Sequence, residues 1–482
     1  MKLHARVFRS GVFAAIAAMV LANCLDDAGS NRNERKPGNG EDGVAIWAGE
    51  IAIDPTGHYL VTANEHSVVY GDLETGETRR LSQLRGTTRL AFDHAGKTLF
   101  ASMLDLEVNA DVQLRDNRLL VARGELEFSR LVRFELARNK QVWSRFVDIQ
   151  TLWDPALETY VTYPLLELTR DDARLIVTQP REVQVVDAES GKLLYSLGGL
   201  PGRVVDVDLT PDQSQLVVTL AHEWVDREHP RTLIRVLDLG SFAVHEIEVP
   251  NCSSELAITP DGKHALLAPP DCRPPERRRH DPVSVIDLEH GEFVRNLPGF
   301  GPVALAEGGT LAVAFMDREA IDESLFDDPA QIPTEGPRYR LMLIDTASLS
   351  FETIELGDEL PRYAVAPDGQ LLLVDSPKIW DDGRIRLLDT KTRELSQLAG
   401  PGLDLDNYVM TRDSTQVFLL SDGLFRISLP ERRAYAEPIT FTPTRINITP
   451  DDRRLVLRED ASTVWLYEIE TSEMKRSLDL DR

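Results

Sequence analysis

The chain has 482 residues, with 79 acidic and 53 basic side chains and a formal net charge of −26. Its 42% hydrophobic and 27% charged residues are ordinary for a globular protein, which excludes wholesale disorder and a multi-span membrane protein. The acidic balance also argues against nucleic acid as a partner, because phosphate binding needs clustered Lys and Arg.

The N-terminal residues predict an export signal. A basic region with Lys2, Arg6 and Arg9 precedes an apolar run from Val12 to Ala22. This run is too short to span about 30 Å of hydrocarbon as a helix, but it has the length of a secretory signal core. Residues 1–23 are therefore predicted to be a signal peptide, and the rest of the chain would carry a net charge of −29 after its removal.

The end of this signal predicts a modification. The segment Leu21-Ala22-Asn23-Cys24 resembles the lipobox of bacterial lipoproteins, although those prefer Gly, Ala or Ser where this chain has Asn23. The resemblance implies that Cys24 is lipidated and becomes the new N-terminus. Ordinary cleavage after Ala22 is the alternative, and it would leave Cys24 as a thiol near the terminus.

The next segment predicts a tether. Residues 24–43 are rich in Gly, Asn, Asp and Pro and have almost nothing to bury, so folding could not offset the entropy of ordering them. A flexible tether after a lipidated cysteine would hold the rest of the chain at a membrane. The expected location is the cell envelope, in the periplasm or at the cell surface.

The remaining residues, 44–482, repeat one pattern nine times. Its first part is a turn between two apolar segments, best seen in Ile258-Thr259-Pro260-Asp261-Gly262-Lys263. Pro presets φ at the second turn position and Asp-Gly suits the turn's exit, so each copy predicts a tight hairpin. The other copies lie at residues 54–57, 93–96, 169–172, 210–213, 306–309, 366–369, 411–414 and 449–452.

The second part of the pattern is a β-rich run that ends in Asp and another turn, such as Val68 to Gly76. Each unit therefore reads as strand A, tight turn, strand B, loop, strand C, tight turn and strand D. Repeated four-stranded antiparallel units are typical of a β-propeller. We predict an all-β chain with a single β-propeller of seven to nine blades, from nine units that begin near residues 44, 89, 165, 204, 255, 303, 362, 406 and 445.

The TPDG turn and the VxVxDxxTG run resemble those of YVTN-type and WD40-like bacterial propellers over nearly all of residues 44–480. The resemblance implies the fold. It leaves the function open, because propellers host lactonases, electron-transfer domains, scaffolds and receptors alike.

The sequence predicts no catalytic residue and no cofactor. His222, His229 and His280 could meet across one face as metal ligands, but solvated loop histidines are the favoured interpretation, so no metal site is predicted. The chain has no GxSxG nucleophile elbow and no CxxCH haem attachment site. His222-Glu223 opens like a zinc-protease motif, but Asp226 stands where the second histidine is needed. The aspartates that precede the C–D turns are expected to accept backbone N–H bonds within those turns: Asp187, Asp287, Asp345 and Asp389.

Two cysteines in the body of the chain, Cys252 and Cys272, flank the hairpin around Pro260. Export would place them in an oxidising compartment. If Ala257 pairs with about residue 267, counting five residues outward from each puts the cysteines opposite one another, within disulfide range. We therefore predict a structural disulfide in this blade.

Long connections gather at one end of the predicted blades. In a propeller the A–B and C–D turns emerge on one face, and the B–C and D–A connections emerge on the other. The predicted turns are tight, whereas loops on a rigid scaffold often carry function. The long B–C connections lie at about residues 103–130, 220–232, 269–282, 316–339 and 375–383, and a long D–A connection lies at 147–164.

Two kinds of side chain are predicted to bind a partner on this face. Trp153, Trp224 and Trp380 are candidates because tryptophan is enriched at interface hot spots, although the indoles could instead cover the edge of the ring. The acidic stretch from Asp317 to Asp328 and a basic cluster would supply opposite charges that orient the partner, while a solvated loop is the alternative for the basic residues. The basic cluster contains Arg273, Arg277, Arg278, Arg279 and His280.

The leading interpretation is an exported, lipid-anchored propeller that acts as a binding or scaffold module at the cell envelope. Its partner would be a protein or another envelope component, and its contact with the membrane would be the lipid anchor alone. The alternative implied by the YVTN-type resemblance is an enzyme of lactonase-like type, for which no catalytic residue can be mapped onto this chain. No cofactor is expected.

Overall fold

The computed structural model contains strands and one short 3-10 helix, η2 (Glu307–Gly309), among the residues it describes. Met1 to Gly43 and several later segments lie outside the description. The described residues are 44–47, 51–63, 68–81, 84, 87–104, 112–115, 118–121, 129–147, 151–154, 159–162, 165–222, 231–251, 253, 255–268, 282–321, 325–326, 332–333, 335–358, 362–366, 369, 371–375, 385–398, 407–420, 423–459 and 463–479.

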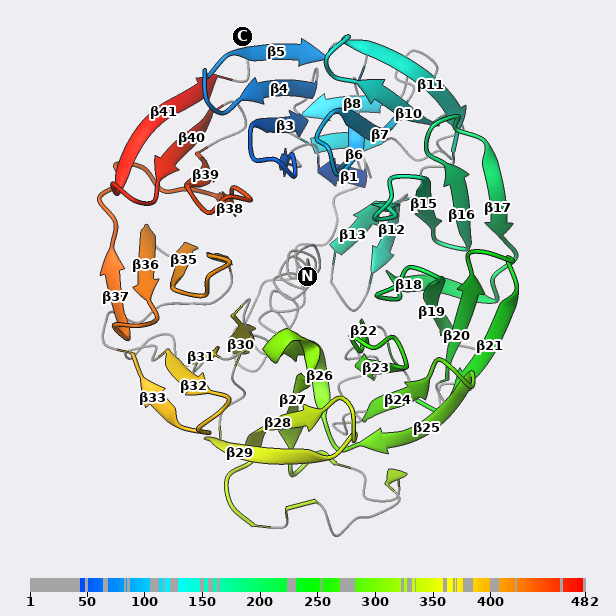
Figure 1. Ribbon diagram of the computed structural model, residues 1–482, viewed down its shortest axis with the longest axis vertical. Helices are drawn as coiled ribbons and strands as arrows, with labels where there is room; N and C mark the ends of the chain where they lie inside the picture. The colour runs from blue at the N-terminus through cyan, green and yellow to red at the C-terminus, as the bar shows by residue number, and fades with distance from the viewer. Residues whose placement is uncertain are drawn as a thin grey trace, which may run out of the picture. The chain divides into compact units, whose positions relative to one another are not determined.

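The described strands form nine four-stranded antiparallel sheets, and in each sheet the strands follow one another in chain order (Figure 1). This repeated meander confirms the predicted all-β fold, and the chain is a β-propeller with a sheet count inside the predicted range. We number these sheets as blades 1 to 9 along the chain and call their successive strands A to D.

The blades fall into two compact units. The terminal unit combines blades 1 to 3 with blade 9, from residues 22–199 and 438–482. Its blades comprise β2 (Ile51–Ile53), β3 (Tyr59–Ala63), β4 (Val68–Asp72) and β5 (Thr78–Leu81); β6 (Thr87–Phe92), β7 (Thr98–Leu104), β10 (Ser129–Glu135) and β11 (Lys140–Phe146); β14 (Leu165–Leu168), β15 (Arg174–Gln179), β16 (Glu182–Asp187) and β17 (Leu193–Leu197); and β38 (Arg445–Ile448), β39 (Arg454–Arg458), β40 (Thr463–Glu468) and β41 (Glu473–Asp479).

The middle unit, Leu200–Glu437, contains blades 4 to 8. Their strands are β18 (Gly202–Leu209), β19 (Gln215–His222), β20 (Thr232–Asp238) and β21 (Val244–Val249); β22 (Glu255–Ile258), β23 (His264–Ala268), β24 (Val283–Asp287) and β25 (Glu292–Leu297); β26 (Phe300–Ala306), β27 (Leu311–Asp317), β28 (Tyr339–Asp345) and β29 (Phe351–Gly357); β30 (Arg362–Val365), β31 (Leu371–Asp375), β32 (Arg386–Asp389) and β33 (Leu395–Gln397); and β34 (Tyr408–Met410), β35 (Gln416–Leu420), β36 (Leu424–Ser428) and β37 (Arg433–Ala436).

The Thr and Asp of the repeated A–B turn hold it closed. In blade 5 the Thr259 hydroxyl donates to Asp261 at 2.6 Å, and the backbone N–H of His264 donates to the Thr259 oxygen at 3.0 Å. The N–H of Lys263 also donates to Asp261 at 3.0 Å. These bonds all lie within six consecutive residues, which is why the sequence alone predicts the hairpin.

The glycine near the end of an A–B turn lies against the A–B turn of the preceding blade. In blade 6, Gly309 has a φ of 91°, and a Cβ there would lie only 1.9 Å from Cγ of Pro260 in blade 5. Gly262 has a φ of 73°, and a Cβ there would lie 3.4 Å from Cδ of Pro211 in blade 4, an ordinary contact distance. A side chain at Gly309 would therefore collide with the proline of the neighbouring turn, whereas at Gly262 the positive φ is the main restriction.

The aspartates before the C–D turns have the predicted local role. Asp345 accepts the backbone N–H of Ser348 at 2.7 Å and its hydroxyl at 2.7 Å. Asp187 and Asp389 accept N–H groups in the equivalent turns, and Asp287 accepts the N–H of His290. These hydrogen bonds lower the pKa of Asp345 in the folded chain.

The hydrophobic core lies between adjacent blades rather than within one sheet. In the terminal unit, separate apolar clusters join blades 1 and 2 and blades 2 and 3. In the middle unit, four clusters join blades 4 to 8 in chain order. Within each unit, neighbouring sheets therefore bury the faces that they turn toward each other.

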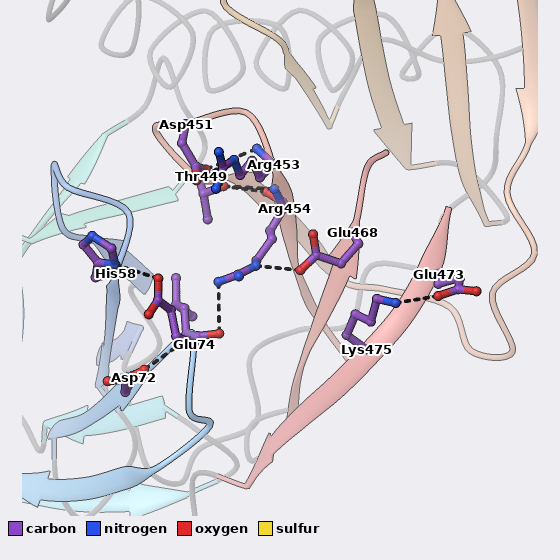
Figure 2. Close-up of polar contacts among 11 residues, drawn as sticks. His58, Asp72, Glu74, Thr449, Asp451, Arg453, Arg454, Glu468, Glu473 and Lys475 are labelled. Atoms are coloured by element: carbon purple, nitrogen blue, oxygen red, sulfur yellow. Dashed lines mark hydrogen bonds and ion pairs between the residues drawn. The ribbon is translucent and has the colours of Figure 1, made fainter. Parts of the chain in front are cut away.

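The first and last blades of the chain pack against each other inside the terminal unit. Leu60 and Val69 of blade 1 share a buried cluster with Val456 and Leu466 of blade 9. Figure 2 shows the polar part of this junction, where Nε of Arg454 lies 2.7 Å from Glu468. The same guanidinium donates to the carbonyl of Leu73 in blade 1 at 3.1 Å.

Neighbours in sequence make a similar contact, with the donor on strand D instead of strand B. Arg79 of blade 1 donates to the carbonyl of Leu136 in blade 2 at 2.7 Å, and the Trp143 indole of blade 2 donates to Ala188 of blade 3 at 3.2 Å. In each case a side chain of one blade satisfies a carbonyl in the C–D turn of the next. The ends of the chain are thus joined as regular neighbours.

Two segments expected as loops contain strands. β8 (Val112–Arg115) and β9 (Arg118–Val121) form a hairpin in the B–C connection of blade 2, and β1 (Val44–Trp47) pairs with β9. β12 (Thr151–Asp154) and β13 (Thr159–Thr162) form a hairpin in the D–A connection. The first unit was expected to begin at residue 44, but its strand A begins at Ile51 because residues 44–47 pair elsewhere.

Candidate functional site

The connections between strands differ sharply at the two ends of the blades. Every A–B and C–D turn spans four or five residues. The long connections are of the other two kinds, as predicted, and a further D–A connection follows β33. We call the end with the A–B and C–D turns the turn end and the opposite end the insertion end. Antiparallel topology alone puts these connections at opposite ends of each sheet.

The predicted binding residues lie largely outside the described residues. Trp224, Trp380, the arginines from Arg273 to Arg279 and His280 are all outside, as is Cys24. Trp153 lies in β12 opposite Tyr160 of β13, at the insertion end of blade 2, and only its backbone is described. The candidate hot spots therefore stay predictions.

The register near the two cysteines differs by one residue from the expected one. Ala257 pairs with Leu266 instead of residue 267, and the ladder between β22 and β23 ends at Glu255 opposite Ala268. Cys252 and Cys272 themselves lie outside the described residues. Their disulfide stays a prediction, without the pairing of directly opposed residues on which it was based.

The best described insertion is the B–C connection of blade 6, between β27 and β28. Its two ends are joined by Asp317 and Arg338, whose Nη2 donates to Oδ2 at 2.8 Å and whose Nε donates to both oxygens at 3.1 Å. Asp317 is 1% exposed. The carboxylate of this bidentate pair is buried. Separating it from Arg338 would leave a buried charge without a partner, which is energetically costly.

Further contacts fix the same connection. Asp317 also accepts the N–H of Glu319 at 3.0 Å, and the guanidinium of Arg338 lies 4.8 Å from the centre of the Tyr339 ring. The hydrogen bonds and charge of Asp317 raise the pKa of Arg338. The side chain of Asn296 in blade 5 donates to the carbonyl of Leu325 at 3.0 Å.

This pair corrects the expected charge on the insertion end. Asp317 was predicted to begin an exposed acidic stretch, but it is buried and neutralised by Arg338. Its physical role is to hold the base of the insertion. The burial of Asp317 could not be predicted from the sequence, because its partner Arg338 lies at the far end of the insertion.

A second group of ionisable residues lies on the first strands of the middle unit. Asp206 of β18 and Glu255 of β22 each stand four residues before the Thr of their A–B turns, so they occupy equivalent positions in neighbouring blades. The N–H of Leu256 donates to Asp206 at 2.9 Å and links the two blades. Burial raises the pKa of Asp206 and raises that of Glu255 to about 7.

Two tyrosines occupy another pair of equivalent positions. Tyr363 and Tyr408 each stand three residues before the first residue of an A–B turn. The Tyr363 hydroxyl donates to the carbonyl of Val313 at 3.1 Å, and its ring packs edge-on against Phe315. Burial raises the pKa of Tyr408 to about 12, and burial followed by the charge of Glu255 raises the pKa of Tyr363.

These residues differ in what they can do chemically. Asp206 and Tyr363 form hydrogen bonds with backbone groups near register shifts in the pairing of β18 and of β26. Their role is therefore structural. Glu255 has a pKa that would let it hold or release a proton near neutral pH. This group was not predicted from the sequence, although the alternation Val-Asp-Val-Asp in residues 205–208 places two acids in the strand that leads into the predicted turn at 210–213.

Within the described residues, no three or more His, Cys, Asp or Glu side chains are grouped so that they could hold a metal ion. No helix of that part of the chain is long and apolar enough to cross a membrane.

Comparison with known proteins gives fold likeness only. No protein-family model matches the chain, and no curated protein matches it. Hydrazine synthase of Kuenenia stuttgartiensis is 18% identical with a TM-score of 0.37, covering 66% of this chain and 95% of that one. A eukaryotic initiation factor is 12% identical with a TM-score of 0.49, covering 91% and 89%.

A third solved structure is the dihydro-heme d1 dehydrogenase NirN in complex with DHE. It is 15% identical with a TM-score of 0.48, covering 89% of this chain and 74% of that one. Likeness at this level carries no argument about what this chain binds or catalyses.

Proposed function

We propose that the chain is an exported, lipid-anchored β-propeller that binds a protein partner at the cell envelope through its insertion end. The observation that carries the proposal is the difference between the two ends of the blades. Every turn at the turn end has four or five residues, whereas all the long connections are at the insertion end. Functional loops on a rigid scaffold have this distribution.

The blade 6 insertion supports a role in recognition. Its base is fixed by Asp317 and Arg338, so part of the surface is ordered before a partner arrives. Preorganised loops lose less conformational entropy on binding than loops that must first be ordered. The proposed anchor rests on the sequence of residues 1–43, with lipid on Cys24.

The test is affinity capture from crosslinked envelope with the full chain and its Trp224→Ala and Trp380→Ala variants. Loss of a hot-spot tryptophan costs about 2 kcal/mol, so capture of the partner should weaken roughly 30-fold. The melting temperature should change little. His58→Ala, at an exposed A–B turn, is the matched control and should capture normally. Equal capture by the tryptophan variants would contradict the proposal.

A further inference from the structure

The outer strand of blade 2 presents an unusual surface. Along β11, side chains alternate between the interior and solvent, so that Lys140, Val142 and Phe146 are exposed. Trp143 points the other way and packs against Gly191 of blade 3. Phe146 is 68% exposed and Val142 is 43% exposed, the two highest values among the exposed large apolar residues described.

This apolar strand lies in a basic region of an acidic chain. β10, β11 and the turn between them carry five basic residues and one acid, Glu135, although the chain has a net charge of −26. The guanidinium of Arg130 lies 5.9 Å from the centre of the Phe146 ring. The basic residues are Arg130, Arg133, Arg138, Lys140 and Arg145.

Other outer strands have a different character. β5, in the neighbouring blade 1, also carries two arginines and no acid, whereas β21, β25 and β29 each carry glutamate. Arg138 is 76% exposed, and Lys140 makes no ion pair with any described residue. Blade 2 therefore has the largest basic excess of any C–D hairpin among the described residues.

The predicted tether leads to this same blade. β1 begins one residue after the tether and pairs with β9, which belongs to the B–C connection of blade 2. A flexible chain the length of residues 25–43 has a root-mean-square span of roughly 24 Å. An anchor at Cys24 would therefore keep blade 2 close to the membrane surface.

We propose that the β11 surface, formed by Arg130, Arg138, Lys140, Val142 and Phe146, docks on an anionic lipid bilayer. Basic side chains bind lipid phosphates electrostatically, and an exposed aromatic ring inserts at the boundary between headgroups and acyl chains. The orientation rests on the proposed lipid anchor, whereas the affinity of the surface for anionic lipid does not. Docking would orient the propeller at the membrane in addition to tethering it.

The test uses the mature chain, residues 24–482, with Cys24→Ser, which contains every described residue and carries no lipid. Binding is measured by co-sedimentation with vesicles of phosphatidylglycerol and phosphatidylcholine, and with vesicles of phosphatidylcholine alone. The chain should bind the anionic vesicles, and binding should weaken as salt rises. Lys140→Glu should weaken it at least about fivefold, and Phe146→Ser about tenfold.

Matched controls come from the middle unit. Lys263→Glu changes a lysine that is 59% exposed, and Val294→Ser changes a valine that is 41% exposed on β25. Both should bind vesicles as the parent does, and melting temperatures check that each variant is folded. Absent binding to anionic vesicles, or equal losses in β11 and control variants, would overturn the proposal.

The lipid anchor is assessed separately by fractionating cells that express the unaltered chain. A chain that is not lipidated in cells but still binds anionic vesicles through β11 would contradict the proposed lipid anchor and support the proposed docking surface. A chain that is lipidated in cells but whose Cys24→Ser form does not bind the vesicles would support the lipid anchor and overturn the docking surface.

Discussion

At the scale of single residues, most polar side chains that recur in the repeat stabilise their own turn. Asp345 and Thr259 accept backbone N–H groups within five residues of themselves. Such contacts are local, so the sequence alone predicts them. Asp317 shows the limit of this approach, because its charge is neutralised by Arg338 at the far end of an insertion.

The C–D turn aspartates predict a defined pH dependence. Because hydrogen bonds lower the folded-state pKa of Asp345, its contribution to stability is present above the unfolded pKa of about 4 and is lost as pH falls through the lower folded value. Asp345→Ala should lower the free energy of unfolding by about 1 kcal/mol at pH 7. Urea unfolding between pH 3 and 7 measures this difference, which should shrink at the acidic end.

Glu292→Ala is the control for this experiment, since the glutamate is exposed and its carboxylate has no ion-pair partner among the described residues. It should change stability by less than about 0.5 kcal/mol at every pH. A loss that is equally large at pH 3 would show that the Asp345 carboxylate charge is not the cause.

At the scale of elements, the sequence predicts the four strands of each unit and misses pairings between distant segments. β22 and β23 were predictable because their turn lies between them. The pairing of Val44 with Val121 was not, because nothing in either short segment specifies a partner so far along the chain. The one-residue register difference at Ala257 has a similar origin, since turn residues bound a hairpin but do not fix its exact pairing.

The junction between blades 9 and 1 can be tested through adjacent arginines. Arg454 is half-buried and binds both Glu468 and the Leu73 carbonyl, whereas Arg453 is 78% exposed and reaches Asp451 only at 3.8 Å. Arg454→Ala should reduce the free energy of unfolding by about 2 kcal/mol, and Arg453→Ala by less than about 0.5 kcal/mol. Urea unfolding checks both. Similar losses would show that the junction does not depend on Arg454.

At the scale of the whole molecule, two features of the described residues bear on the proposed function. The first and last blades share a core and a hydrogen bond of the kind found between sequential blades, so the chain ends stabilise one another. The long connections are confined to the insertion end, which leaves the turn end plain. The repeat pattern predicted this asymmetry, but it could not give the positions of Trp224 or Trp380, which lie outside the described residues.

The most direct test of the proposed binding end places one photo-crosslinking amino acid at either end of blade 6. Glu335 is exposed in the insertion between β27 and β28, and Ala347 is exposed in the C–D turn of the same blade. After irradiation of intact cells, we expect a specific crosslinked envelope protein from position 335 and none from position 347. The same crosslinked product from both positions, or a product from position 347 alone, would contradict it.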